Sequence, residues 1–257
     1  MYIDLNNAVV FILVMLRMTG MLAMNPIFGR ANIPVMLRLG FAFIVTIMLT
    51  LVMPFPNLAD PNLTTLIFMA IMELMVGYTA GVILGLFLTI MITGGQVMDM
   101  QMGLAMANVF DPNTNMQMAL TATVFNAMFI LSFFVTNNHL TFILMTAQTF
   151  DVIPIGTVGI STRALFYVPH LFSSVLLFAT KMTLPMVVVQ IIVTMSVGVI
   201  MRIVPQINIF VLSIQLKLLV GMLVLVLLVG PLMGFMESLW AIGFERIWEM
   251  WQLMAGA

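Results

Sequence analysis

Long stretches of this chain carry no charged side chain, and no other sequence feature constrains the fold as strongly. Among them are Leu39–Met53, Leu74–Met98, Pro112–Phe150 and Met182–Met201. Several match the roughly 20 apolar residues that a bilayer-crossing helix needs. The sequence therefore predicts an all-α, integral membrane-complex protein, built from broken and hairpin hydrophobic helices.

Composition narrows the function further. Of the 257 residues, 63% are hydrophobic and 7% are charged, whereas soluble globular chains are about 25% charged. The net charge of −1 provides no basic field to hold nucleic acid. Cysteine is absent, which excludes disulfides, thiolate metal sites and thiol nucleophiles. We expect a chain surrounded by lipid or by other subunits, with no nucleic-acid partner.

Six hydrophobic segments are predicted, separated by proline, glycine and asparagine. The fifth is too long for one straight crossing, and Pro169 and Pro185 inside it predict a kinked helix or two helices in a hairpin. Three tryptophans in the tail, residues 236–253, suit a membrane or headgroup boundary. The segments are about 5–24, 35–53, 63–93, 118–136, 164–201 and 209–233, with a further apolar piece at 140–150 and a connection at 94–117.

No arrangement of side chains predicts catalysis. The two histidines, His139 and His170, have neither a carboxylate cluster nor metal-ligand spacing around them. A phosphate-binding Gly-x-x-x-x-Gly-Lys loop is absent, and Gly94-Gly95 alone is too weak a pattern for a nucleotide site. The chain is therefore predicted not to be an enzyme and to use no metal or cofactor.

Four ionisable residues, Arg17, Glu73, Lys181 and Lys217, lie inside apolar segments. A charge facing lipid is costly, so each is predicted to face protein or water. One interpretation is a proton or ion relay. The other is that Lys and Arg extend to the membrane surface or bond to backbone carbonyls. The second is favoured for the three cations, and Glu73 stays open because a short carboxylate cannot reach far.

Three glycines, Gly77, Gly81 and Gly85, follow one another at four-residue spacing in the third segment. This spacing places them on one helix face, where the backbone of another helix can approach closely. Chance among 17 glycines is the alternative. We interpret the three glycines as a tight helix–helix seam.

Methionine is unusually abundant, with 29 residues. Its unbranched side chain repacks around surfaces of different shape, so a ring of methionines could close a pore and still deform around a passing polypeptide. Phe110, beside Asp111-Pro112, would be a bulky stopper in such a loop. The alternative is that methionine merely replaces leucine as filler. The clustered methionines are Met98, Met100, Met102, Met106, Met116 and Met118.

Several short patterns follow one another along the chain. In order they are Arg17, Pro26-x-x-Gly29, Ile33-Pro34, Arg38, Glu73-x-x-x-Gly77-x-x-x-Gly81, Gly95-x-x-x-Asp99-x-x-x-Gly103, Asp111-Pro112, Asn138-His139, Ile153-Pro154 and Arg202-x-x-Pro205-Gln206-x-Asn208-x-Phe210. Together they resemble the FliR family of type III secretion export-gate proteins, which includes FliR, SpaR and YscT. The last pattern is the most specific. One departure is that this chain has Ser213-Ile-Gln215-Leu-Lys217 where the family has Gly-x-Pro-x-Lys. A kink at this point of the helix is therefore in doubt.

The resemblance implies a subunit of the flagellar export gate, in the bacterial inner membrane and within the basal body. It implies assembly with FliP and FliQ into a pore for unfolded flagellar proteins, with FlhB and FlhA nearby. It also implies a FliP-like part over residues 1–180, followed by a FliQ-like helical hairpin and tail over 181–257. The family's plug loop corresponds to about 103–118, with gate residues Met106, Phe110, Asp111, Pro112, Met116 and Met118.

Three alternatives remain. The first is the equivalent subunit of a virulence injectisome, which shares the fold and differs in cargo; the Gly-x-x-x-Asp-x-x-x-Gly and Asp-Pro patterns favour the flagellar subunit. The second is a small-molecule secondary transporter, a class that often shows internal repeats, and none is evident here. The third is a structural scaffold, in which the loop and the glycine seam serve only packing.

Overall fold

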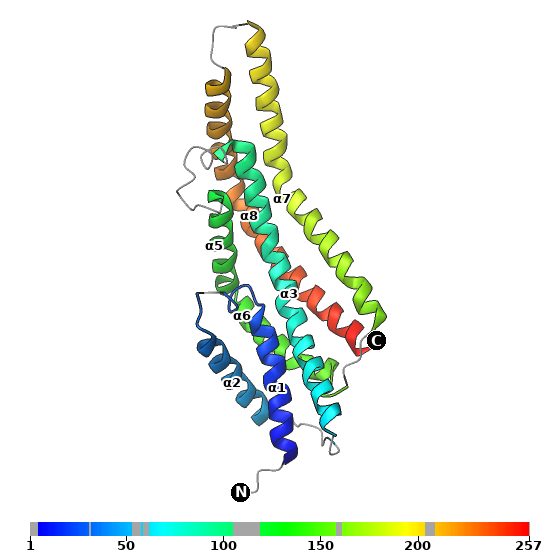
Figure 1. Cartoon of the computed structure of the whole chain (residues 1–257). Helices are drawn as coiled ribbons and strands as arrows, with labels where there is room; N and C mark the ends of the chain where they lie inside the picture. The colour runs from blue at the N-terminus through cyan, green and yellow to red at the C-terminus, as the bar shows by residue number, and fades with distance from the viewer. Residues whose placement is uncertain are drawn as a thin grey trace. The chain divides into compact units, whose positions relative to one another are not determined.

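The computed structural model describes residues 5–30, 32–52, 58, 62–104, 119–157, 161–203 and 209–256, and these ranges contain helices and no strand (Figure 1). The helices are α1 (Leu5–Ala23), α2 (Val35–Val52), α3 (Leu63–Met102), α5 (Leu120–Val135), α6 (Asn138–Val152), α7 (Thr162–Ile203) and α8 (Ile209–Ala255). Five of them are long and apolar enough to cross a membrane, and the broken pair α5–α6 would make a sixth. The prediction of an all-α membrane protein is confirmed.

Local sequence signals explain several of the helix ends. Pro34 directly precedes α2, where its missing N–H matters least. Gly103 ends α3 with φ +80°, a backbone conformation that favours glycine. Asn137 separates α5 from α6 in the left-handed region, at φ 58°, which asparagine tolerates. Before α7, the Ser161 hydroxyl accepts a hydrogen bond from the N–H of Arg163, as a helix-capping side chain does.

Three predicted boundaries are wrong, each because a helix continues further than expected. α3 runs to Met102, through Gly94-Gly95, instead of ending near residue 93. α7 is one helix through both prolines, which rules out two helices in a hairpin within 164–201. α8 continues to Ala255 and includes the predicted tail. For α3, packing of Gly94 against Met182 and of Gly95 against Ala122 holds the helix together where glycine alone favours a break.

The chain forms two compact units, and α3, α7 and α8 each contribute to both. Unit 1 contains residues 1–87, 137–172 and 240–257. Here α3 packs against α1, and Gly243 of α8 lies against the Phe87 and Leu84 side chains of α3. Phe11 of α1 meets Phe43 of α2 edge to face, with ring centroids 5.7 Å apart. The core of this unit is therefore built around the first part of α3.

Unit 2 contains residues 88–136 and 173–239. The end of α3 has neighbours on several sides here: Gly95 lies against Ala122 of α5, Gly94 lies against Met182 of α7, and Met102 lies against Gly221 of α8. Neighbours on several sides are expected of a helix that is apolar all round. The predicted division near residue 180 falls inside α7 and stays a prediction.

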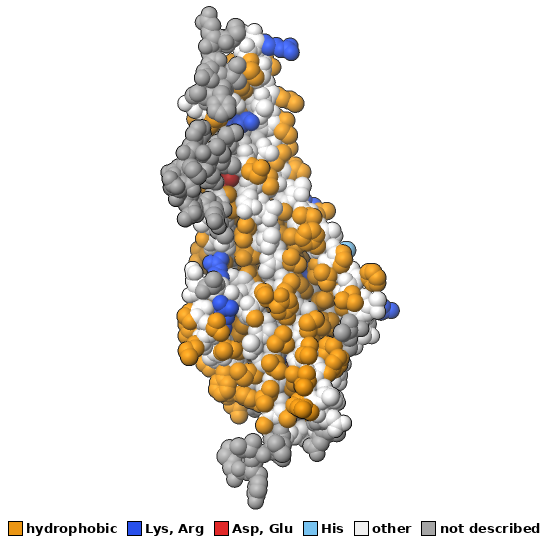
Figure 2. All heavy atoms as spheres, in the orientation of Figure 1, with side chains coloured by type: hydrophobic (Ala, Val, Ile, Leu, Met, Phe, Trp, Pro, Cys, Tyr) orange, Lys and Arg blue, Asp and Glu red, His pale blue; other side chains and the backbone are white. Residues whose placement is uncertain are grey.

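Much of the remaining apolar surface is left uncovered by the chain itself. In α2, 11% of residues are buried, and in the most apolar stretches of α7 and α8 the share is 17%, against 50% in the corresponding stretch of α3. Hydrophobic side chains accordingly cover much of the face drawn in Figure 2. Lipid or other subunits must cover these helices, because exposed apolar patches of this extent mark interaction surfaces.

Candidate functional site

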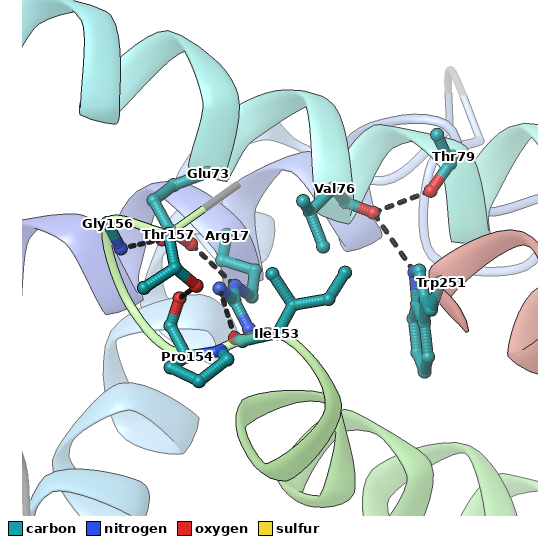
Figure 3. Close-up of polar contacts among 9 residues, drawn as sticks. All are labelled: Arg17, Glu73, Val76, Thr79, Ile153, Pro154, Gly156, Thr157 and Trp251. Atoms are coloured by element: carbon teal, nitrogen blue, oxygen red, sulfur yellow. Dashed lines mark hydrogen bonds and ion pairs between the residues drawn. The ribbon is translucent and has the colours of Figure 1, made fainter. Parts of the chain in front are cut away.

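A fully buried ion pair joins α1 to α3 in unit 1 (Figure 3). Arg17 Nε donates to Glu73 Oε2 over 2.5 Å, and both side chains have 0% exposure. The second guanidinium nitrogen, Nη2, donates to the Ile153 carbonyl oxygen over 3.0 Å. On the other side, the Gly156 N–H donates to Glu73 Oε1 over 3.0 Å. Three segments distant in the sequence therefore meet at one pair of charges.

The turn after α6 is shaped to present these two backbone groups. Gly156 has φ +80°, which glycine adopts without a steric penalty. The Thr157 hydroxyl and N–H both donate to the Pro154 carbonyl, at 2.8 and 3.2 Å. Ile153 and Ile155 anchor the turn in the core, with exposures of 1% and 4%. The turn is thus held in place both by the apolar packing of Ile153 and Ile155 and by its backbone hydrogen bonds to the ion pair.

This geometry favours a structural clamp over an ion relay. Both carboxylate oxygens of Glu73 have donors, and the Arg17 guanidinium also lies over the Phe150 ring, 4.3 Å from its centroid. Arg17 Nη1 has no hydrogen-bond partner among the described residues. Of the two outcomes considered for Arg17, bonding to a backbone carbonyl is observed, and extension to the membrane surface is not. Removing one partner of such a pair leaves a buried charge, at a cost of about 3–5 kcal/mol.

The glycine face of α3 lies directly beside this pair. A Cβ built on Gly77 would overlap the Arg17 carbonyl oxygen, and one on Gly81 would come within 3.0 Å of the Asn25 nitrogen. Gly85 is looser, because its Cβ would lie 3.8 Å from the Met24 carbonyl oxygen. Gly20 of α1, which the sequence analysis did not identify, would overlap the Leu74 carbonyl oxygen in the same way. Close backbone contact between α1 and α3 thus brings the two charges into reach.

A second polar contact, in unit 2, links the end of α3 to the start of α5. The buried Asp99 carboxylate accepts the Thr121 N–H over 2.9 Å and also the Thr121 hydroxyl. Ala119, the residue before α5, provides no side-chain cap, so Asp99 takes that role from another helix. A Cβ on Gly95 would overlap the Ala122 backbone. The Gly-x-x-x-Asp-x-x-x-Gly pattern therefore brings together the two ends of the 104–119 segment.

The other predicted site residues lie partly on α7 and α8 and partly outside the described ranges. Lys181 is exposed on α7 and Lys217 is half-buried on α8, so for these two the prediction that each faces protein or water stays a prediction. Arg202 is exposed near the end of α7, and Phe210 lies in the first turn of α8. The proposed roles of the remaining residues stay predictions, because these residues lie outside the described ranges. They are Met106, Phe110, Asp111, Pro112, Met116, Met118, Pro205, Gln206 and Asn208.

The tryptophans correct another prediction. Trp240 and Trp251 each have 1% exposure, so they belong to the core of unit 1 and not to a headgroup boundary. The Trp251 Nε1–H points at the Val76 carbonyl oxygen of α3, 3.4 Å away (Figure 3). Nearby in sequence, Glu249 pairs with Arg246 over 2.6 Å and accepts the Tyr167 hydroxyl. Sequence alone could not tell these buried aromatics from interfacial ones, since both positions favour tryptophan.

Comparison with known proteins agrees with the patterns along the chain. The model of the family described as "Bacterial export proteins, family 1" matches residues 8–242. Flagellar biosynthetic protein FliR of Escherichia coli (strain K12) is 25% identical over 227 residues, which are 88% of this chain and 87% of that protein. The FliR of Bacillus subtilis (strain 168) is 25% identical over 240 residues, 92% of each chain. That of Aquifex aeolicus (strain VF5) is 27% identical over 219 residues, 82% of this chain and 81% of its own length.

Proposed function

Because this chain belongs to the bacterial export proteins, family 1, we propose that it is a subunit of a flagellar type III secretion export gate. With FliP and FliQ it forms the pore through which unfolded flagellar proteins are exported, and FlhB and FlhA lie nearby. Its place is the inner membrane, at the flagellar basal body. It contributes a passage and a scaffold, and no chemical step.

One observation supports this proposal above the others: the chain leaves most of its longest apolar helices uncovered. α2, α7 and α8 expose large hydrophobic side chains along their lengths, including Met36, Leu51 and Val226 at 87%, 81% and 72%. A small-molecule transporter that works alone needs only a lipid-facing exterior. Exposure of these helices fits better with a shared core, in which unlike subunits complete the packing.

The relatives support the proposal that flagellar proteins are the exported cargo. The three relatives described above carry the name of a flagellar biosynthetic protein and match this chain over most of its length. An injectisome subunit of the same family remains the nearest alternative, since fold and packing would be shared. The identity of the co-purifying proteins separates the two.

Within the gate, we assign the plug to the segment of about 103–118. The support is indirect and comes from its two ends, where Asp99 and Thr121 hold α3 to α5. A segment fixed at both ends is restricted in the distance it can span. Met106, Phe110, Met116 and Met118 are the side chains that would meet the passing polypeptide.

Purification from the native membrane in mild detergent tests the assembly. Mass spectrometry of the purified material should find FliP and FliQ with the full-length chain. Recovery of injectisome proteins would instead support the alternative, and recovery of the chain alone as an active solute transporter would contradict both.

A matched test of the plug replaces residues 104–118 with a Gly/Ser linker of equal length. Ion conductance of the assembled complex should rise, and unchanged conductance would refute the plug assignment.

A further inference from the structure

Two arginines are held together at the turn between α1 and α2 in unit 1. Arg38 Nη2 donates to the carbonyl oxygens of Arg30, over 2.7 Å, and Ile33, over 3.1 Å. Arg30 Nε donates to the Pro26 carbonyl oxygen over 3.1 Å. Each guanidinium is therefore fixed to the same short turn, although like charges repel. No carboxylate in the described part of the chain forms an ion pair with Arg38.

An apolar cleft begins beside this turn, between α1, α2 and α6. Phe28 and Phe41 form its near wall, with stacked rings whose centroids are 5.4 Å apart. Val45, Phe142 and Ile143 continue the lining. The cleft holds about 340 Å³ of empty space including its open mouth, but the centre of a water-sized sphere could move through only about 20 Å³. Its interior is too narrow for an alkyl chain, so only its open, apolar mouth could receive one.

Positively charged and apolar groups follow one another along a single face of α2. Arg38, Phe41 and Val45 are spaced i, i+3 and i+7, which places them on the same side of a helix. Figure 2 shows Lys and Arg side chains gathered near the start of α2, with hydrophobic side chains covering the helix beyond them. The order matches the order of groups in a phospholipid, in which a charged head precedes an alkyl tail.

We propose that the turn between α1 and α2, with the adjoining cleft, binds an anionic phospholipid. Arg30 and Arg38 bind the phosphate, because a guanidinium offers paired donors that match phosphate oxygens. The first turn of α2 adds the favourable end of the helix dipole. The alkyl chain lies across the mouth of the cleft, along the half-buried side chains of Phe41 and Val45. Basic groups beside apolar grooves between membrane helices are recognised headgroup sites, and the chain itself leaves this one uncovered, because 11% of the residues of α2 are buried.

Lipid retention tests this site in the full-length chain, purified with whatever subunits accompany it. Phospholipid bound per chain is measured by mass spectrometry for the wild type and for Arg30→Gln/Arg38→Gln. The double variant should retain at least about fivefold less phosphatidylglycerol and cardiolipin, the loss expected when about 1 kcal/mol of binding is removed. Arg163→Gln is the matched control, since Arg163 is an exposed arginine at the start of α7, and it should retain wild-type amounts.

Two further arms keep the proposal falsifiable. Val45→Trp keeps both charges and fills the cleft, so it should also lower lipid retention. In delipidated protein, phosphatidylglycerol should raise the midpoint of thermal unfolding, while inorganic phosphate and phosphatidylcholine should not. Should the double variant fail to purify, Arg30→Gln alone and Val45→Trp provide the test. Equal retention in these variants and in Arg163→Gln, or an equal response to inorganic phosphate, would overturn the proposal.

Discussion

Two pairs of glycines with the same four-residue spacing differ in what surrounds them. Gly77 and Gly81 of α3 are pressed against the backbone of α1, where an added Cβ would overlap or crowd its atoms. Gly230 and Gly234 of α8 have no heavy atom of the described chain within 4 Å of an added Cβ, apart from their own helix and chain neighbours. Spacing alone therefore does not distinguish a seam inside the chain from a face that the chain leaves empty.

The difference concerns how each region achieves its stability. The α1–α3 seam is complete within the chain, with glycine contacts and a buried ion pair supporting each other. The α8 face exposes small residues and a large apolar side chain alike, with Leu227 at 69%. Small residues allow close helix approach in membranes, so the second region gains its stability outside the chain, under the proposed function from unlike subunits.

The largest expected effect comes from breaking the ion pair at the seam. Glu73→Leu leaves Arg17 buried without its carboxylate and should lower the free energy of unfolding by about 3–5 kcal/mol. Equilibrium unfolding in mixed detergent micelles, followed by tryptophan fluorescence, measures it. The control is Arg17→Met/Glu73→Leu, which removes both charges and should recover most of the loss. Equal losses in the single and double variants would show that the charge pairing is not the cause.

The next largest effect is expected from filling the seam. Gly77→Ala places a methyl group against the Arg17 carbonyl oxygen and should cost about 1–3 kcal/mol, as overpacking does. The matched control on the same face is Gly85→Ala, whose Cβ would make an ordinary contact at 3.8 Å. The same unfolding measurement serves for both. If the two variants unfold alike, the close approach of α1 to Gly77 is not present in solution.

An effect of similar or smaller size is expected in unit 2 at Asp99. Asp99→Ala leaves the buried N–H and hydroxyl of Thr121 without an acceptor, which costs about 1–3 kcal/mol. Thr121→Ser keeps both donors and should stay close to the wild type. Under the proposed function, Asp99→Ala should also raise the ion conductance of the assembled complex. A stable variant with wild-type conductance would separate this contact from the gate.

The smallest effect, with the opposite sign, is expected on the empty face. Gly234→Ala meets no atom of the described chain and replaces glycine inside a helix, so it should stabilise α8 by about 0.5–1 kcal/mol. A larger side chain sharpens the comparison. Gly234→Leu should leave the fold of the chain intact while lowering the amount of FliP and FliQ that co-purifies. Destabilisation of the isolated chain by Gly234→Ala would show that this face is already packed.

Part of the candidate site could be predicted from the sequence, and part could not. The charges Arg17 and Glu73 and the glycines Gly77 and Gly81 could be identified, because each departs from the apolar background of its helix. The pairing of Arg17 with Glu73 could not be predicted, because 56 residues separate the two charges. The sequence around a buried cation also does not show whether it bonds to a carboxylate or to a backbone carbonyl. Gly20 was missed for the same reason: its importance depends on the helix opposite.

The sequence by itself determined the membrane character, the all-helical class and the family, because these follow from apolar length, local backbone preference and short patterns along the chain. It also determined the break between α5 and α6 at Asn137, since a positive φ is a local property that asparagine tolerates. Only the tertiary structure decided that α3 continues through Gly94-Gly95 and that Trp240 and Trp251 are buried. Those outcomes depend on which surfaces meet. Contacts between residues far apart in the sequence stabilise them. The free energy of these contacts exceeds the local backbone preferences, and it is gained only when the chain folds.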